Sequence, residues 1–207
     1  MSGSGRTPVV VFDLGGVLID WNPRHLYRGL FEDEAAMELF LAEVCSPAWN
    51  LRQDAGRPFA EAVAELAARH PEQRPMIEAY WQRWPEMIAG EIEDAVGVLA
   101  ELRRADFELH ALTNWSAETF MVARERFDFL AWFESILVSA EVGLVKPDPR
   151  IFALLLERIG REAHACLYID DSEPNVEAAR ALGFDAIRFE DGRRLRSDMA
   201  ARGLLQA

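Results

Sequence analysis

Residues Val9 to Asp20 read V-V-V-F-D-L-G-G-V-L-I-D, and this stretch decides the fold. Four apolar, mostly β-branched residues run directly into Asp13, and the glycines Gly15 and Gly16 follow shortly after. Such a run indicates a buried strand that opens into a tight loop. Open α/β sheets bind ligands beyond the carboxyl ends of their strands, so the Asp13 carboxylate is well placed for chemistry. On this stretch alone, an aspartate that merely caps a turn explains the pattern equally well.

Later stretches of the chain carry further polar groups, each directly after an apolar run. In chain order these groups are Thr113 with Asn114, Lys146, and the adjacent pair Asp170 and Asp171. Taken in this order with Asp13, they resemble the four motifs of the haloacid dehalogenase-like (HAD) hydrolase superfamily. The resemblance covers nearly the whole chain, from about Val9 to Phe189.

Composition narrows the range of partners. The chain has 207 residues and a formal charge of −13, and no basic block offsets that charge. This argues against a nucleic-acid or anionic-membrane binder. No apolar run approaches the roughly 20 residues that span a bilayer, and the N-terminus lacks a secretory signal, so we expect a cytoplasmic protein. Residues 1–6 are expected to be disordered.

The segment between the first two predicted core strands has a helical pattern. Apolar residues recur at helical spacing in residues 37–44, 59–66 and 74–84. Because a simple strand-to-helix connection is much shorter, we interpret the segment as a helical cap domain inserted into the fold. The predicted division is core for residues 1–17, cap for residues 18–90, and core again for residues 91–207.

From Ile92 the pattern alternates regularly between helix and strand. The predicted helices are 92–104, 116–127, 149–159 and 173–182, the predicted strands are 107–113, 135–140, 165–170 and 184–189, and a last helix covers 195–205. Alternation of this kind implies a parallel sheet. The predicted fold class is therefore α/β, with a Rossmann-like doubly wound parallel sheet and a small inserted α-helical cap.

The polar groups suit phosphoryl transfer. Asp13 can attack phosphorus and form an aspartyl-phosphate that water then hydrolyses. Thr113 offers a hydroxyl and Asn114 an amide to a phosphoryl oxygen, although Thr113 could instead make an ordinary strand-end hydrogen bond. Lys146 can neutralise charge on the phosphate and on Asp13. It is the only lysine in the chain, which weakens the alternative of a solvated surface residue.

The acidic pair points to a metal. Hard oxygen ligands with no nearby histidine or thiolate favour Mg²⁺, with one carboxylate binding the ion and the other bracing the site. Adjacent acids at a helix start could also serve only the helix dipole. The resemblance implies that Mg²⁺ is held by the Asp13 carboxylate, the Gly15 backbone carbonyl and Asp171. It also implies that Asp170 holds Lys146, with Asn175 nearby.

Gly15 departs from the superfamily pattern. Most phosphatases and mutases that resemble this chain have a second aspartate there, which protonates the leaving oxygen and later activates water. Such help is worth roughly a hundredfold to ten-thousandfold in rate. Either the leaving group departs unaided, or the cap supplies an acid, with Asp20 and His25 as candidates. Members similar to sugar-1-phosphate phosphatases also carry glycine there.

We therefore expect a Mg²⁺-dependent phosphomonoester hydrolase that acts on a small phosphorylated metabolite such as a sugar phosphate. The first alternative is a 2-haloacid dehalogenase, which uses the same aspartate without metal. Those enzymes usually carry an aromatic residue in place of Gly15 and lack the acidic pair. The second alternative is a catalytically weak binding or regulatory protein. A monomer and a dimer both remain open.

The cap should determine substrate specificity. Its conspicuous polar and aromatic residues are Trp21, Arg24, His25, Trp49, Arg52, Arg57, Trp81 and Trp84. Most of the tryptophans at helical spacing are expected to fill the cap's core. Trp49 and Arg52 lie near the turn at residues 54–56, and a turn of a small cap can reach over the active site. These two are therefore the predicted substrate-binding residues of the cap.

Overall fold

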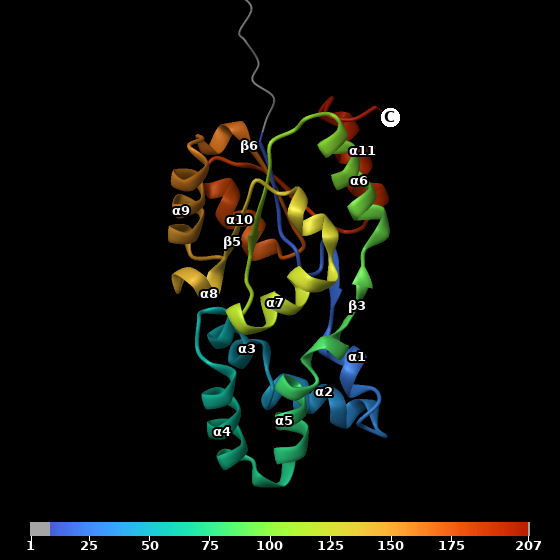
Figure 1. The fold of residues 1–207 in the computed structure, drawn as a ribbon, viewed down its shortest axis with the longest axis vertical. Helices are drawn as coiled ribbons and strands as arrows, with labels where there is room; N and C mark the ends of the chain where they lie inside the picture. The colour runs from blue at the N-terminus through green and yellow to red at the C-terminus, as the bar shows by residue number, and fades with distance from the viewer. Residues whose placement is uncertain (1–8, 207) are drawn as a thin grey trace, which may run out of the picture.

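The computed structural model describes residues 9–206, and a five-stranded parallel sheet forms its centre (Figure 1). The strand order is β5-β4-β1-β6-β7. The strands are β1 (Val9–Phe12), β4 (Leu109–Thr113), β5 (Ser135–Val138), β6 (Cys166–Asp170) and β7 (Asp185–Arg188). From the central β1 the chain builds β4 and β5 on one side and then crosses to build β6 and β7 on the other. The crossing makes the ends of β1, β4 and β6 immediate neighbours.

Helices cover both faces of the sheet, which confirms the predicted doubly wound α/β class. Val10 and Phe12 of β1 pack into one core and Val9 and Val11 into the other, because successive strand residues point to opposite faces. The first core includes residues from α6 (Glu93–Arg104), α7 (Ala117–Arg126) and α11 (Gly192–Ala201). The second includes residues from α9 (Pro149–Ile159) and α10 (Glu173–Ala181).

A helical insertion follows the first strand, as predicted, and lies at the end of the molecule opposite the C-terminus (Figure 1). Its helices are α1 (Pro23–Tyr27), α2 (Glu34–Glu43), α3 (Pro47–Asp54), α4 (Phe59–Arg69) and α5 (Arg74–Gln82). Aromatic side chains fill its centre, with Tyr80 packed against both Trp49 and Phe59. The exact cap boundaries at residues 18 and 90 stay a prediction. Within residues 9–206, no helix is long and apolar enough to cross a membrane.

A two-stranded antiparallel ribbon joins the insertion to the core, and the sequence patterns did not predict it. It consists of β2 (Ile19–Trp21) and β3 (Ile88–Glu91). Strands of three or four residues are too short to display a period of two. Arg126 of α7 fixes the ribbon against the core, since its guanidinium donates to the carbonyl oxygens of Ile88 at 3.0 Å and Ala89 at 3.2 Å.

Several predicted boundaries were wrong by a few residues. The predicted strand 135–140 ends at Val138, where the short helix α8 (Ser139–Val142) begins, and the predicted strand 107–113 begins only at Leu109. The last helix is shifted from 195–205 to Gly192–Ala201, because Asp191 caps it by accepting the Arg194 N–H at 2.8 Å. Within residues 9–206 the structure also has four 3₁₀ turns, at Pro71–Gln73, Trp84–Met87, Asp128–Trp132 and Ala163–Ala165. The disorder expected for residues 1–6 lies outside the described residues.

Two glycines provide a matched test of the packing between α11 and α6. A Cβ atom on Gly192 would lie 2.4 Å from the Asp94 Cβ and 2.6 Å from its backbone carbon, whereas one on Gly97, within α6, would meet nothing within 4 Å. We predict that Gly192→Ala lowers the free energy of unfolding by about 1–3 kcal/mol through overpacking. Gly97→Ala should raise it by up to about 1 kcal/mol through helix propensity. Urea unfolding curves check both values, and equal effects would contradict the packing.

Candidate active site

The sheet register brings the motif residues together at the ends of three strands. Phe12 of β1 pairs with Ile169 of β6, so Asp13 and Asp170 lie side by side one residue further on. The Asp13 backbone N–H donates to the Ile169 carbonyl at 2.8 Å, which continues the ladder of hydrogen bonds to Asp13. The Asp13 carboxylate turns into the following loop and accepts the Leu14 N–H at 2.7 Å.

Lys146 lies at the centre of the site and is only 2% exposed. Its Nζ lies 2.9 Å from Asp13 Oδ2 and 2.7 Å from Asp170 Oδ2, and it donates to the Leu112 carbonyl at 3.0 Å. Burial acts to lower the pKa of the lysine, but the two carboxylates outweigh it and raise that pKa above its usual value. The single lysine of the chain is thus a charged counterion shared by two buried acids.

Asp170 is fully buried and held from several directions. Its carboxylate accepts the Ser172 N–H at 2.9 Å and the Asn175 side-chain amide at 3.0 and 3.1 Å, and it also accepts the Tyr168 hydroxyl. Burial alone would raise the pKa of Asp170, but Lys146 and these donors lower it. Asp170 is therefore an ionised brace whose oxygens are already occupied by protein donors.

Asp13, Asp170 and Asp171 bring carboxylate oxygens within 4.8 Å of one another. Gly16 permits this crowding, because its φ is +76° and a Cβ there would lie 2.5 Å from Asp171 Oδ2. Burial, together with the charge of Asp170, raises the pKa of Asp13 to about 7 despite Lys146. Burial and Asp170 also raise the pKa of Asp171. A hard divalent cation would relieve this repulsion, so the donor set fits Mg²⁺.

Another group of potential metal ligands within residues 9–206 is Glu108, His110 and Glu134. One of its acids is already partnered, since Glu108 forms an ion pair with Arg161 and a hydrogen bond with the His110 ring at 3.1 Å. The other ring nitrogen of His110 contacts the Ser135 hydroxyl at 2.8 Å. The three-aspartate cluster is therefore the better match for an oxygen-seeking cation.

Thr113 and Asn114 end β4 in different ways. Thr113 is the last residue of the strand and is 1% exposed. The Asn114 side chain binds the Lys146 backbone twice, accepting its N–H at 2.8 Å and donating to its carbonyl at 3.0 Å. These contacts hold the Lys146 segment in place and use one of the two N–H donors of the Asn114 amide, and the expected contact of Asn114 with a phosphoryl oxygen stays a prediction.

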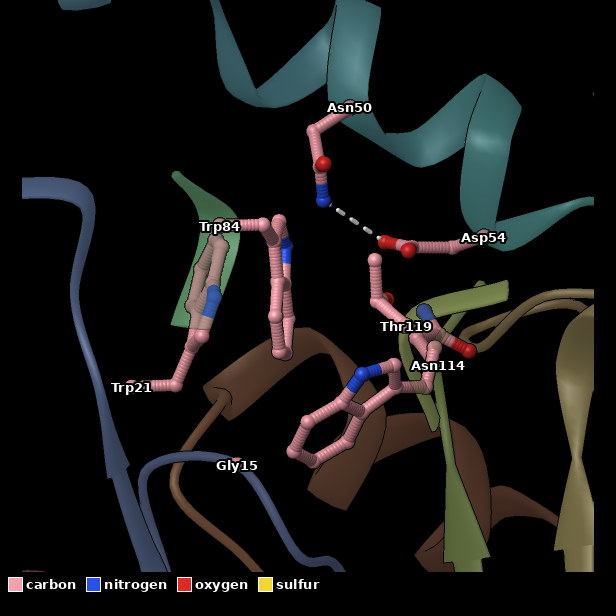
Figure 2. A pocket seen from close by; sticks show the side chains of 8 residues that line it. Gly15, Trp21, Asn50, Asp54, Trp84, Asn114 and Thr119 are labelled. Atoms are coloured by element: carbon pink, nitrogen blue, oxygen red, sulfur yellow. Dashed lines mark hydrogen bonds between the residues drawn. The ribbon is translucent and has the colours of Figure 1, made fainter. Parts of the chain in front are cut away.

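A small cavity of about 60 Å³ lies between the strand ends and the insertion (Figure 2). The residues that line it are Gly15, Trp21, Asn50, Asp54, Trp84, Asn114, Trp115 and Thr119. Gly15 lies on the core side, and the side chains of Asn50 and Asp54 enter from α3 on the opposite side (Figure 2). The insertion therefore forms one wall of the site.

Some of the predicted cap residues line the cavity and others lie away from it. Trp21 and Trp84 line the cavity, whereas Trp49 and Arg52 do not. Trp49 is buried in the insertion, with its ring 5.0 Å from that of Tyr80, and Arg52 is exposed. Residues 47–54 form the helix α3, and the turn follows at residues 55–56, so Trp49 faces the insertion's core and a different face of α3 meets the cavity.

That other face carries Asp54, which the sequence reasoning missed. Asn50 and Asp54 are four residues apart on α3, so they lie on one side of the helix, and the Asn50 amide donates to Asp54 Oδ2 at 2.9 Å. Ser46 and Pro47 form an N-terminal cap and first turn that could have predicted this helix from the sequence. The expected acid candidates Asp20 and His25 instead pair with each other at 3.0 Å and do not line the cavity.

Comparison with known proteins identifies the family. Residues 7–183 match the family model of the haloacid dehalogenase-like hydrolases. The chain therefore belongs to the haloacid dehalogenase-like hydrolase family, as its motifs predicted.

The individual relatives have low sequence identity to this chain. The sesquiterpene phosphatase astK of Aspergillus oryzae is 24% identical over 181 residues, covering 87% of this chain and 89% of the relative. Flavin mononucleotide hydrolase 1 of Arabidopsis thaliana is 29% identical over 107 residues, covering 52% of this chain and 43% of the relative. This chain therefore spans less than half the length of the second relative.

Solved structures support the fold. A HAD family enzyme from Bacteroides thetaiotaomicron, in complex with magnesium and inorganic phosphate, matches with a TM-score of 0.68 and 22% identity, covering 90% of this chain and 96% of that one. An L-2-haloacid dehalogenase matches with a TM-score of 0.66 and 22% identity, covering 86% of this chain and 84% of that one. Since the two match about equally well, the side chains of the site must distinguish the chemistries.

The shared counterion leads to a stability prediction. Lys146→Met would leave Asp13 and Asp170 buried without their cation, so the metal-free protein should lose about 3–5 kcal/mol of unfolding free energy at neutral pH. Without the ammonium, both folded-state pKa values lie above their unfolded values, so the loss should grow as the pH rises from 5 to 8. Urea unfolding in chelator measures it. Arg150→Met, which breaks an exposed ion pair with Asp148, is the control and should change the free energy of unfolding little. If the loss in Lys146→Met did not depend on pH, Lys146 would not be the counterion of the two buried acids.

Proposed function

We propose that this protein is a Mg²⁺-dependent phosphomonoester hydrolase that works through a phosphorylated Asp13. The observation that carries the proposal is the cluster of Asp13, Asp170 and Asp171 around the buried Lys146, at the ends of adjacent strands. The Asp13 carboxylate also accepts the Leu14 N–H in the loop that continues to Gly15, and Gly15 lines the cavity. A nucleophile, a fixed cation and metal-binding oxygens are the parts that phosphoryl transfer requires.

Each residue has a distinct role in this proposal. A carboxylate oxygen of Asp13 attacks phosphorus, while Lys146 neutralises charge on the phosphoryl oxygens and keeps Asp13 oriented. Thr113 donates its hydroxyl to a phosphoryl oxygen. Asp170 is a positioning residue, since its oxygens hold Lys146 and are bound by Asn175.

The metal would be held by Asp13, Asp171 and the backbone carbonyl of Gly15. When bound, Mg²⁺ neutralises charge on the phosphoryl group and orients it for in-line attack. The magnesium and phosphate in the related Bacteroides thetaiotaomicron enzyme support this choice of ion and substrate. The phosphatase activity named for the Aspergillus oryzae relative supports the reaction class.

The cavity walls support a ring-bearing substrate with oxygen acceptors, such as a sugar phosphate. Trp21, Trp84 and Trp115 contribute flat aromatic surfaces, and the rings of Trp84 and Trp115 lie 5.7 Å apart. The indole N–H groups of Trp21 and Trp115 are buried without a hydrogen-bond partner. Buried donors of this kind are costly unless a ligand satisfies them, so substrate hydroxyls are suitable partners.

Dehalogenation is the competing chemistry, and two features oppose it. A metal-independent displacement of halide has no use for a third carboxylate, whereas Asp171 adds one to the cluster. Gly15 also leaves open the position where the dehalogenases that resemble this chain carry an aromatic side chain. Halide release from 2-haloacids is therefore expected to be absent.

The proposal predicts that Asp13→Asn lowers turnover of an aryl phosphate by about a thousandfold or more, equivalent to at least ~4 kcal/mol, because an amide cannot form the covalent intermediate. A steady-state assay with saturating Mg²⁺ measures this, and unfolding curves confirm that the variant folds. Wild-type activity should disappear in chelator. Near-normal turnover of Asp13→Asn would contradict the covalent route, and chelator-resistant halide release would favour the dehalogenase.

Metal binding can be tested without turnover. Mg²⁺ at about 100 times its dissociation constant should stabilise the fold by about 2.7 kcal/mol, which raises the melting temperature by roughly 5 to 10 °C. Asp171→Asn should largely remove this shift, because it deletes a ligand charge. Glu134→Gln, in the other acidic cluster, is the matched control and should keep the shift. Thermal melts with and without Mg²⁺ measure it; loss of the shift in Glu134→Gln alone would move the metal to that cluster.

A further inference from the structure

Gly15 has no side chain that could donate a proton to the leaving group or accept one from water. A Cβ atom at Gly15 would meet nothing within 4 Å, so the space that an acidic side chain could occupy is open. Gly15 also lines the cavity beneath the insertion. A proton donor contributed from elsewhere must therefore reach this same cavity.

Asp54 is the carboxylic acid among the residues that line the cavity. It is the last residue of α3, and Figure 2 shows its carboxylate directed into the space that Gly15 borders from the core side. Two contacts hold it there. The Ser139 hydroxyl donates to the Asp54 carbonyl at 2.5 Å, and the Asn50 amide donates to the Asp54 carboxylate at 2.9 Å.

The support for Asp54 extends into the core of the insertion. The buried Tyr80 hydroxyl donates to the Asn50 side-chain oxygen at 3.0 Å, which orients the Asn50 amide toward Asp54. A chain of three side chains thus fixes the carboxylate relative to the cavity. This arrangement aims an acid at the cavity with a precision that a solvated surface aspartate would lack.

The surroundings of Asp54 favour a carboxyl group that holds a proton near neutral pH. Burial raises the pKa of Asp54 to about 7, although the Ser116 backbone N–H and the charge of Lys146 act to lower it. The remaining groups that face it, the Asn50 amide and the Tyr80 hydroxyl behind it, are neutral. A position at the C-terminus of α3 also disfavours negative charge, because the helix dipole is negative there.

We propose that Asp54 is the general acid and base of this enzyme, replacing across the cavity the side chain that Gly15 lacks. The inference rests on the proposed phosphatase function and adds a catalytic residue to it. It also assigns the insertion a chemical role in addition to substrate selection.

Asp54 alone donates and accepts the protons that the two steps of the reaction require. In the first step an Asp13 oxygen bonds to phosphorus and the bond to the leaving oxygen breaks. The leaving oxygen keeps the electron pair and takes the proton of the Asp54 carboxylic acid, so the alcohol departs and Asp54 becomes a carboxylate. In the second step water attacks the phosphorus of phospho-Asp13 and gives one proton to Asp54, while the bond between phosphorus and the Asp13 oxygen breaks and its electron pair stays on Asp13. Phosphate is released, and both aspartates return to their starting states.

The simplest competing role for Asp54 is structural, because its contacts with Ser139 and Ser116 join α3 to the core. A structural anchor would affect all substrates equally when it is removed. An acid is needed in proportion to the basicity of the leaving oxygen. The dependence of kcat/KM on leaving-group pKa therefore distinguishes the two roles.

The experiment measures kcat/KM at saturating Mg²⁺ for a series of phosphate monoesters, from nitrophenyl phosphates through phenyl phosphate to alkyl phosphates. Wild-type enzyme should show a shallow dependence on leaving-group pKa. Asp54→Asn should lose roughly a hundredfold to ten-thousandfold on alkyl phosphates and much less on nitrophenyl phosphates, giving a steep dependence. Glu43→Gln removes an exposed acid of the insertion and should match wild type.

A rescue variant provides the second arm. Because the space at Gly15 is open, Gly15→Asp can place a carboxylic acid on the other side of the same cavity. Added to Asp54→Asn, it should restore the shallow dependence and part of the lost alkyl phosphatase activity. A merely structural role for Asp54 would not respond in this way, since the added side chain does not replace the contact between the Asp54 carboxylate and the Ser116 backbone.

Each remaining outcome contradicts either the role of Asp54 alone or the proposed function together with it. If Asp54→Asn slows all the esters by the same factor, or none of them, Asp54 is not the acid although the phosphatase function stands. The same holds if Asp20→Asn steepens the dependence instead. If wild-type enzyme hydrolyses none of the esters, nitrophenyl phosphates included, the proposed function itself fails, because those leaving groups need no acid, and the role of Asp54 fails with it.

Discussion

The ammonium group of Lys146, buried between Asp13 and Asp170, is the interaction on which the rest of the site depends. Two carboxylates at adjacent strand ends would repel each other in a buried place, and the lysine offsets that repulsion at 2.9 and 2.7 Å. The neighbouring groups serve this arrangement. Asn114 binds the lysine's backbone on both sides, and Asn175 holds the second carboxylate. Asp171 then adds the charge that a divalent cation would balance.

In the proposed mechanism, the two parts of the chain contribute to opposite ends of the reaction. The sheet would supply the nucleophile and the oxygens suited to a metal, because parallel strands end at one edge. The insertion closes over that edge with α3 and with the β2–β3 ribbon, which bring Asp54 and Trp21 to the cavity. The leaving group of a bound ester would lie toward this second wall. The proposal therefore makes substrate choice and leaving-group protonation depend on how the insertion packs on the core.

The sequence predicted the sheet and the order of the motifs because both depend on local pattern. An apolar run that ends in Asp13 or Asp170 places that residue at a strand end wherever the strand lies in the sheet. Side chains whose role depends on distant partners were not predictable in this way. Asn114 was predicted as a phosphate ligand, but its contacts with the backbone of Lys146, 32 residues later, were not predicted. Asp54 was overlooked because it was assigned to the turn at residues 54–56. The face of α3 that Asp54 shares with Asn50 was therefore not considered.

The central claim is that Asp13 forms a covalent bond to phosphorus within this carboxylate and lysine cluster. The most direct test is to mix the enzyme with Mg²⁺ and an aryl phosphate, quench it in acid within one turnover, and map the added mass by peptide mass spectrometry. The account predicts one phosphoryl group on the peptide that contains Asp13, lost on treatment with hydroxylamine, as expected of an acyl phosphate. Phosphate release under the same conditions with no label on Asp13 would contradict it.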